Sequence, residues 1–132
     1  MPDLRWDSVI VTGGLDTMQT VSRYGTTGFV EDLPSLVVGR RYHGCGSYLR
    51  DSDGSQVRNY DLSVHSDFSP QVLLVAGGFD GNNYLSSTEV LTTSSSGWSL
   101  TTPLPERLHN LRGVNSGGKL YVTGKVFITF DK

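Results

Sequence analysis

The sequence predicts an all-β protein built from repeated short strands. The chain has 132 residues, of which 16 are Gly and 5 are Pro, a turn-rich composition that disfavours a helical bundle. Three apolar, largely β-branched runs end in glycine, at residues 9–14, 74–78 and 120–124. These runs are nearly continuous rather than alternating, which is typical of strands covered on both faces. We therefore expect one domain of buried strands that end at glycines.

Charge and cysteine usage exclude several classes of protein. The formal net charge is only -2, so nothing favours binding to nucleic acid or to an anionic membrane. Cys45 is the only cysteine, which rules out an internal disulfide and a four-cysteine zinc site. The longest apolar run, 72–76, is far shorter than the roughly 18 residues of a membrane span. Residues 1–10 lack the basic and apolar regions of a signal peptide.

The strands follow from these runs and from the segments between them. A polar loop comes after each of the first two runs, at 15–22 and 79–87, and an apolar segment then resumes. Asp53-Gly54 is a turn signal between the segment around Tyr48 and the second run, so these two segments should form a hairpin. We expect strands near residues 8–13, 21–25, 44–50, 72–77, 87–92, 97–101, 111–116 and 119–124.

A longer pattern is kept twice along the chain. After each double glycine come a loop, a strand, a glycine followed by an aromatic residue, a Leu-Pro pair and an arginine. The matching segments are Gly28-Phe29 and Gly97-Trp98, then Leu33-Pro34 and Leu104-Pro105, then Arg40 and Arg107. Two copies in the same order indicate an internal repeat.

This pattern resembles the kelch repeat, a unit of about 50 residues that forms one blade of a β-propeller. The resemblance covers nearly the whole chain except 57–71 and the last few residues. It departs from the family at Phe29, where a Trp is expected, and at Lys125, which replaces a second glycine. The residues that carry it are Gly13, Gly14, Tyr24, Phe29, Gly77, Gly78, Trp98, Tyr121 and Gly124.

The resemblance implies part of a kelch-type propeller, with about two four-stranded antiparallel blades and incomplete ends. The blade fragments would span about 1–42, 43–108 and 109–125. Double glycines would supply backbone angles with positive φ. We expect Trp98 and Phe29 to fill the gaps between adjacent sheets, although a large aromatic residue can also serve as a ligand-stacking platform.

The spacing of the repeats is irregular. Gly13 and Gly77 lie 64 residues apart, whereas Gly77 and Gly124 lie 47 apart. The excess matches the segment 57–71, which we interpret as an insertion in the returning strand of the hairpin. It is either a surface loop, which costs little closure entropy, or an intron translated in frame. The segment 126–132 is an atypical tail that follows the third glycine where a polar loop is expected.

Candidate chemistry is sparse. Residues 51–55 look like a hairpin turn rather than a calcium loop, because Tyr60 stands where the final acidic ligand is required. His43 and Cys45 would share one face of a strand, but a free cysteine is usually a buried core residue, and we expect that here. His43, His65 and His109 lack metal-ligand spacing. We therefore expect no catalytic residue, no metal and no cofactor.

The kelch resemblance implies a non-catalytic module that binds a protein partner through the loops between strands. Tyr and Arg dominate interface hot spots, which favours loops that carry them. For Arg40 and Arg107, hydrogen bonding between blades is an equally good explanation. The alternative function is a fragment of a propeller enzyme or carbohydrate-binding propeller, similar to galactose oxidase, whose catalytic blades lie outside this chain. The candidate binding residues are Arg40, Arg41, Asp80, Asn82, Asn83, Tyr84 and Arg107.

Overall fold

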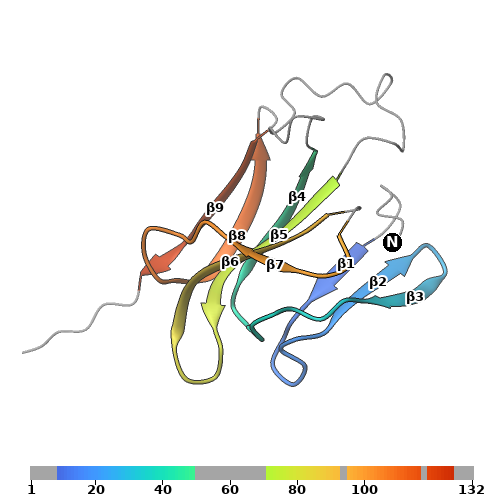
Figure 1. Cartoon of the computed structure of the whole chain (residues 1–132), viewed down its shortest axis with the longest axis horizontal. Helices are drawn as coiled ribbons and strands as arrows, with labels where there is room; N and C mark the ends of the chain where they lie inside the picture. Colours follow the sequence, from blue (N-terminus) through green and yellow to red (C-terminus); the bar gives the residue numbers. More distant parts are fainter. Residues whose placement is uncertain (1–8, 50–70, 93–94, 117–118, 127–132) are drawn as a thin grey trace, which may run out of the picture.

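The computed structural model describes residues 9–49, 71–92, 95–116 and 119–126. All secondary-structure elements in these ranges are β-strands. The strands form three antiparallel sheets (Figure 1). The three-stranded sheet contains β1 (Val9–Thr12), β2 (Val21–Gly25) and β3 (Gly28–Leu33). The four-stranded sheet contains β4 (Gly44–Leu49), β5 (Gln71–Phe79), β6 (Tyr84–Thr92) and β7 (Ser99–Thr101). The two-stranded sheet contains β8 (Leu108–Ser116) and β9 (Lys119–Val126). The prediction of an all-β fold is confirmed.

We expected about two four-stranded sheets, whereas the described residues contain one. The sequence interpretation also missed β3. Gly28 adopts a φ of 116° and pairs with Gly25, so that Thr26 and Thr27 close a tight hairpin between β2 and β3. Two glycines that flank two residues were the signal for this turn.

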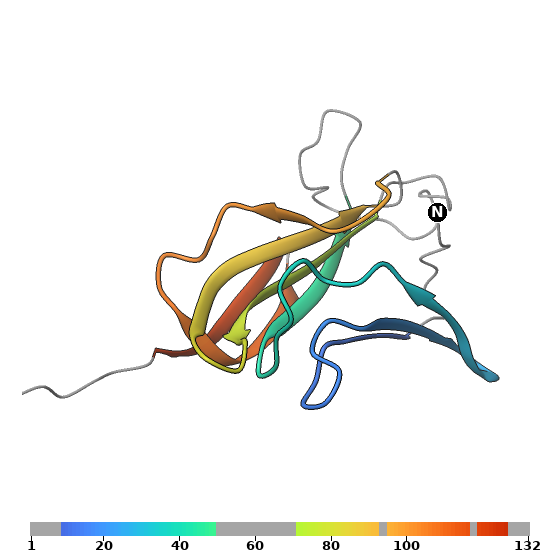
Figure 2. The same ribbon diagram turned by 60° about the horizontal axis from the view of Figure 1, so that its bottom comes forward.

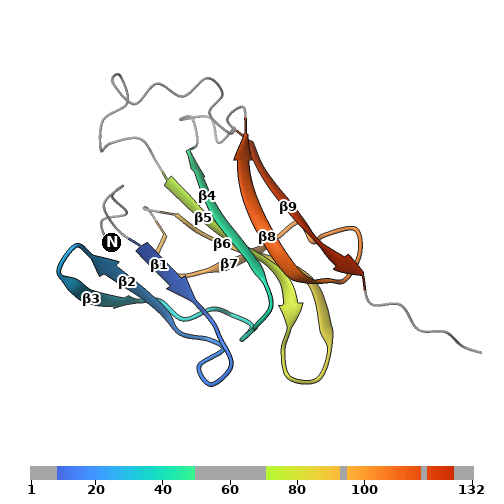
Figure 3. The same cartoon turned by 180° about the vertical axis from the view of Figure 1, so that it is seen from behind.

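The four-stranded sheet lies between the other two, and the views in Figures 1 and 3 agree on this order. One interface is an apolar cluster to which the three-stranded sheet, the segment after it and the four-stranded sheet all contribute: Val21, Leu33, Leu36, Val75, Leu91 and Trp98. Figure 2 shows the segment from β3 to β4 running between these two sheets.

At the second interface, β4 lies close to the two-stranded sheet. A Cβ at Gly44 would meet Leu111 and Val122, and a Cβ at Gly46 would meet Leu120. Glycine on β4 therefore permits the close approach of these two sheets.

Trp98 fills the gap between the three-stranded and four-stranded sheets, as expected. Its side chain is only 7% exposed, and its Nε1 donates a hydrogen bond of 2.8 Å to the carbonyl of Pro34. The same expectation for Phe29 is wrong, because its ring is 60% exposed and packs edge-on against Tyr24 alone among the described rings. No described sheet lies on the side of the three-stranded sheet that carries Phe29.

Both double glycines have positive φ, a backbone conformation that favours glycine. Gly13 and Gly14 have φ values of 62° and 127°, and Gly77 and Gly78 have values of 63° and 97°. A Cβ at Gly13 would collide with the carbonyl of Arg40, and a Cβ at Gly77 would collide with that of Leu108.

The segments that the sequence marked as irregular lie mostly outside the described residues. Residues 57–70 belong there, but Gln71 is the first residue of β5 and pairs with Leu49 of β4. The hairpin of β4 and β5 is therefore formed up to that pair. Residues 127–132 also lie outside the described residues, whereas Val126 is the last residue of β9.

Candidate functional site

Several connecting segments meet at one end of the molecule, at the bottom of Figure 1. We call this the loop end and define it as residues 13–20, 36–43, 79–84 and 107–111. Backbone hydrogen bonds join its parts. The N–H of Gly14 donates to Arg40 (3.2 Å), Arg41 and Phe79 exchange two bonds of 2.9 and 2.8 Å, and the N–H of Leu111 donates to Tyr42 (3.3 Å).

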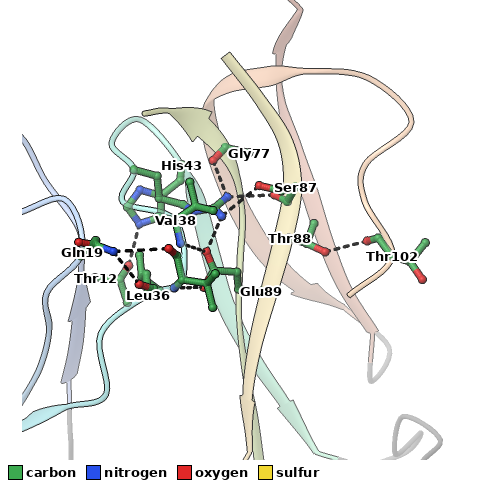
Figure 4. Close-up of polar contacts among 12 residues, drawn as sticks. Thr12, Gln19, Leu36, Val38, His43, Gly77, Ser87, Thr88, Glu89 and Thr102 are labelled. Carbon is green, nitrogen blue, oxygen red and sulfur yellow. Dashed lines mark hydrogen bonds and ion pairs between the residues drawn. The ribbon is translucent and has the colours of Figure 1, made fainter. Parts of the chain in front are cut away.

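A buried ion pair stands beneath the loop end. Arg40 and Glu89 have no exposed surface, and Arg40 Nη2 lies 2.6 Å from Glu89 Oε2. The same carboxylate accepts hydrogen bonds from the N–H groups of Val37 (2.6 Å) and Val38 (2.9 Å). Figure 4 shows this network around Glu89. Glu89 on β6 therefore holds the segment between β3 and β4 against the four-stranded sheet.

The guanidinium of Arg40 makes further hydrogen bonds inside the protein. Nη1 donates to the carbonyls of Gly77 (3.0 Å) and Ser87 (2.9 Å), and Nη2 donates to the Ser87 hydroxyl (3.1 Å). A buried charge that is paired and hydrogen-bonded in this way has a structural role. The interpretation of Arg40 as a partner-binding residue is therefore wrong, and the alternative, hydrogen bonding within the protein, is correct for this residue.

His43 lies beside this ion pair. Its Nε2 is 2.7 Å from the hydroxyl of Thr12, across the interface between the three-stranded and four-stranded sheets. Burial and, second, the positive charge of Arg40 lower the pKa of His43 from 6.5 to about 4. At neutral pH the imidazole is therefore uncharged, and its Nδ1 is buried without a hydrogen-bond partner among the described residues.

Aromatic and cationic side chains form a continuous row across the loop end. The guanidinium of Arg41 lies over the rings of Tyr42 (5.4 Å) and Phe79 (5.3 Å). The ring of Phe79 packs on Tyr84 (5.0 Å), and Tyr84 packs on His109 (4.6 Å). The row joins the four-stranded and two-stranded sheets. Cation–π contact of this kind holds an arginine in a defined position.

The turn between β5 and β6 is fixed by Asp80. One oxygen of its carboxylate accepts the N–H groups of Asn82 and Asn83, each at 2.7 Å, and Gly81 has a φ of 102°. The bonds from Asn83 and then Asn82 lower the pKa of Asp80. Asp80 therefore shapes the turn, and the side chains of Asn82 and Asn83 are exposed on it.

The predicted binding residues all belong to the segments of the loop end, and Arg40 alone among them is buried. Arg41 and Tyr84 belong to the row described above and are partly exposed, and Arg107 is exposed. The sequence interpretation missed Tyr42, whose ring is exposed and whose φ is 58°. It also missed His109 as a member of the row, because a ring contact between distant segments has no local signal.

Cys45 differs from the expectation of a buried core cysteine, because it is exposed. It lies on β4, the edge strand of its sheet, and lines a cavity of about 210 Å³ with Ile10 and Trp98. In the described part of the chain, no three metal-ligating side chains come together. None of the described elements is a helix long and apolar enough to cross a membrane.

No protein-family model matches the sequence, and no curated protein matches it.

Proposed function

We propose that this chain is part of a kelch-type β-propeller and serves as a non-catalytic module that binds a protein partner at the loop end. The observation that carries the proposal is a backbone device that occurs twice. Both glycines of each pair have a positive φ. Farther along the chain, each pair is followed by one residue other than glycine with a positive φ: Tyr42 (58°) after the first pair and Asn110 (51°) after the second. Positive φ is uncommon for residues other than glycine, although Asn adopts it more readily than most, so its recurrence in the same order supports a structural repeat.

The alternation of side chains on the strands supports the same repeat. The positions four and two residues before Gly13, Gly77 and Gly124 face in one direction within each copy. In the four-stranded sheet they pack toward the three-stranded sheet, and in the two-stranded sheet they pack toward the four-stranded sheet. These positions are Val9 and Val11, Leu73 and Val75, and Leu120 and Val122.

The loop end supports binding of a protein. It presents the exposed ring of Tyr42, the exposed guanidinium of Arg107 and the amides of Asn82 and Asn83. The backbone beneath them is held by the Asp80 turn and by the exchange of hydrogen bonds between Arg41 and Phe79. A fixed backbone loses little conformational entropy on binding, and Tyr and Arg are the residue types enriched at interface hot spots, so both features favour an interface.

The experiment compares three forms of the immobilised chain for proteins that they capture from the source cells. The forms are the natural sequence, the variant Tyr42→Ala with Arg107→Glu, and the control Leu100→Ala, which alters an exposed residue of β7 outside the loop end. The partner is a protein captured by the natural sequence and the control but not by the loop-end variant. Calorimetry with that purified protein then measures the loss of affinity, which we expect to be at least about tenfold.

Two results would contradict the proposal. In the first, no protein distinguishes the natural sequence from the loop-end variant. In the second, the captured protein binds the loop-end variant as tightly as the natural sequence in calorimetry.

A further inference from the structure

Two apolar sheet faces at opposite sides of the molecule are not covered by any of the described residues. The upstream face belongs to the three-stranded sheet and carries Val9 (63% exposed), Val11 (49%), Tyr24 and Phe29. The downstream face belongs to the two-stranded sheet and carries Val114 (56%) and Tyr121 (51%). Figure 3 shows these two sheets on either side of the four-stranded sheet.

The strand register places the side chains of each set together. Val9 pairs with Tyr24, and Tyr24 pairs with Phe29, so the three lie on one face. Val114 pairs with Tyr121 in the same way. Exposed apolar side chains that gather on a sheet in this manner mark an interaction site.

The protein itself shows what covers such a face. Val9 and Val11 stand four and two residues before Gly13, where Leu73 and Val75 stand before Gly77. Val75 is buried, and Leu73 packs against the cluster shared with the three-stranded sheet. The upstream face of the three-stranded sheet therefore corresponds to the face of the four-stranded sheet that the three-stranded sheet covers.

The downstream face has the complementary position. Tyr121 and Thr123 stand three and one residues before Gly124, where Ile10 and Thr12 stand before Gly13. Ile10 packs against the cluster shared with the four-stranded sheet, and Thr12 contacts His43. The downstream face of the two-stranded sheet therefore corresponds to the face of the three-stranded sheet that packs against the four-stranded sheet.

The charges on the two faces are also complementary. Asp32 pairs with Ser22 on the upstream face and is exposed there. Arg112 on β8 and Lys119 on β9 are exposed. The strand register places both on the downstream face, opposite to the face that packs on the four-stranded sheet. Opposite charges on two faces favour their docking.

We propose that the downstream face of one copy docks on the upstream face of a second copy, head to tail. The contact repeats between copies the packing that already joins consecutive sheets within one copy. Because the two faces differ, the contact is heterologous: each copy offers one face to its neighbour and keeps the other. The proposal is independent of partner binding at the loop end.

The test measures the mass of the full 132-residue chain in solution as a function of concentration, by sedimentation and light scattering. We expect the natural sequence to associate. Val11→Lys on the upstream face and Tyr121→Glu on the downstream face should each weaken association at least about tenfold, because docking would bury an unpaired charge. Leu15→Lys, an exposed aliphatic residue outside both faces, is the matched control and should leave association unchanged.

Mixing the two variants provides the decisive result. The Val11→Lys copy keeps its downstream face and the Tyr121→Glu copy keeps its upstream face, so the mixture should form a complex with one copy of each. Circular dichroism and thermal unfolding check that both variants keep the fold. If one does not, Val9→Lys or Thr123→Glu replaces it.

Three results would overturn the proposal. The natural sequence stays at the mass of a single copy at every concentration, or only one of the two faces proves necessary for association, or the mixed variants stay single.

Discussion

At the scale of single residues, the decisive finding is that Arg40 lies inside the protein. An arginine shortly after a Leu-Pro pair looks like a loop cation, and the sequence does not reveal its partner. Glu89 lies 49 residues away and forms the ion pair only when β6 packs against the segment after β3. The Glu89 carboxylate and four carbonyl or hydroxyl oxygens accept hydrogen bonds from the guanidinium, while two backbone N–H groups donate to the carboxylate.

Replacing Arg40 should strongly destabilise the protein. In Arg40→Met, the Glu89 carboxylate is left buried without its cation, and we expect the free energy of unfolding to fall by about 3–5 kcal/mol. The double variant Arg40→Met with Glu89→Gln removes the unpaired charge and should lose less stability than Arg40→Met alone. Unfolding in urea measures both variants. Equal stability of Arg40→Met and the natural sequence would contradict a structural role for the pair.

His43 should make the stability depend on pH. Its pKa is about 4 in the folded protein and about 6.5 when unfolded, so the unfolded state binds more protons between these values. Stability is therefore fully present above pH 6.5 and falls as the pH drops toward 4, by about 2–3 kcal/mol. His43→Gln keeps a hydrogen-bonding group beside Thr12 but does not titrate. The measurement is the free energy of unfolding at pH 7.5 and pH 4, and an identical pH dependence in His43→Gln would contradict the prediction.

At the scale of elements, strand pairing follows sequence signals, whereas the contacts between sheets do not. The turns at Gly28 and Gly81 and the double glycines define where strands end, and each signal is local. Trp98 and Phe29 occupy matching places in the sequence pattern, yet one is buried and the other exposed. The difference arises because a neighbouring sheet covers Trp98, whereas no described sheet covers Phe29.

This difference predicts unequal effects of two similar substitutions. Trp98→Ala removes a buried ring and its hydrogen bond to Pro34, and we expect a loss of about 3–5 kcal/mol. Phe29→Ala removes an exposed ring and should cost less than about 1 kcal/mol. Thermal and denaturant unfolding of both variants, each at low protein concentration, compare the two. A loss for Phe29→Ala as large as that for Trp98→Ala would show that our assignment of the interface is incorrect.

Deleting residues 57–70 should leave the fold intact. The hairpin of β4 and β5 pairs from Gly44 with Ala76 to Leu49 with Gln71, so the deletion removes none of its paired residues. The link between the strands becomes three times shorter, which lowers the closure entropy by about 1 kcal/mol. We expect unchanged or slightly higher stability by thermal unfolding. Loss of solubility or of β-structure in circular dichroism would mean that the segment belongs to the core.

At the scale of the whole molecule, the described strands form three sheets packed in series, and no described element covers the two outer faces. In the propeller that we propose, neighbouring blades would cover such faces. Exposed apolar faces favour association with another protein surface. The stability of one copy is therefore tied to what covers its outer sheets.

We expect the melting temperature to rise with protein concentration. Association stabilises the folded state by mass action, because the unfolded chain presents no docking face. Differential scanning calorimetry over a hundredfold range of concentration measures the effect, with Val11→Lys as the variant that lacks it. A sharp transition well above physiological temperature that does not move with concentration would contradict this prediction.

The sequence by itself determined the class of fold, most of the strands and the turns between them. It did so because strand pattern, glycine with positive φ and turn pairs act over a few residues. It also placed the six predicted binding residues other than the buried Arg40, namely Arg41, Asp80, Asn82, Asn83, Tyr84 and Arg107, in segments that the structure brings together at the loop end. Their proximity follows from the strand ends that carry them.

Only the tertiary structure decided the burial of Arg40, the exposure of Cys45 and Phe29, and the low pKa of His43. Each depends on what a neighbouring sheet places against the side chain, and those neighbours lie tens of residues away in the sequence. Burial and charge act through space rather than along the chain, so a pattern of residue types leaves them open. The same reason explains why the two uncovered faces became visible only when the sheets were seen packed together.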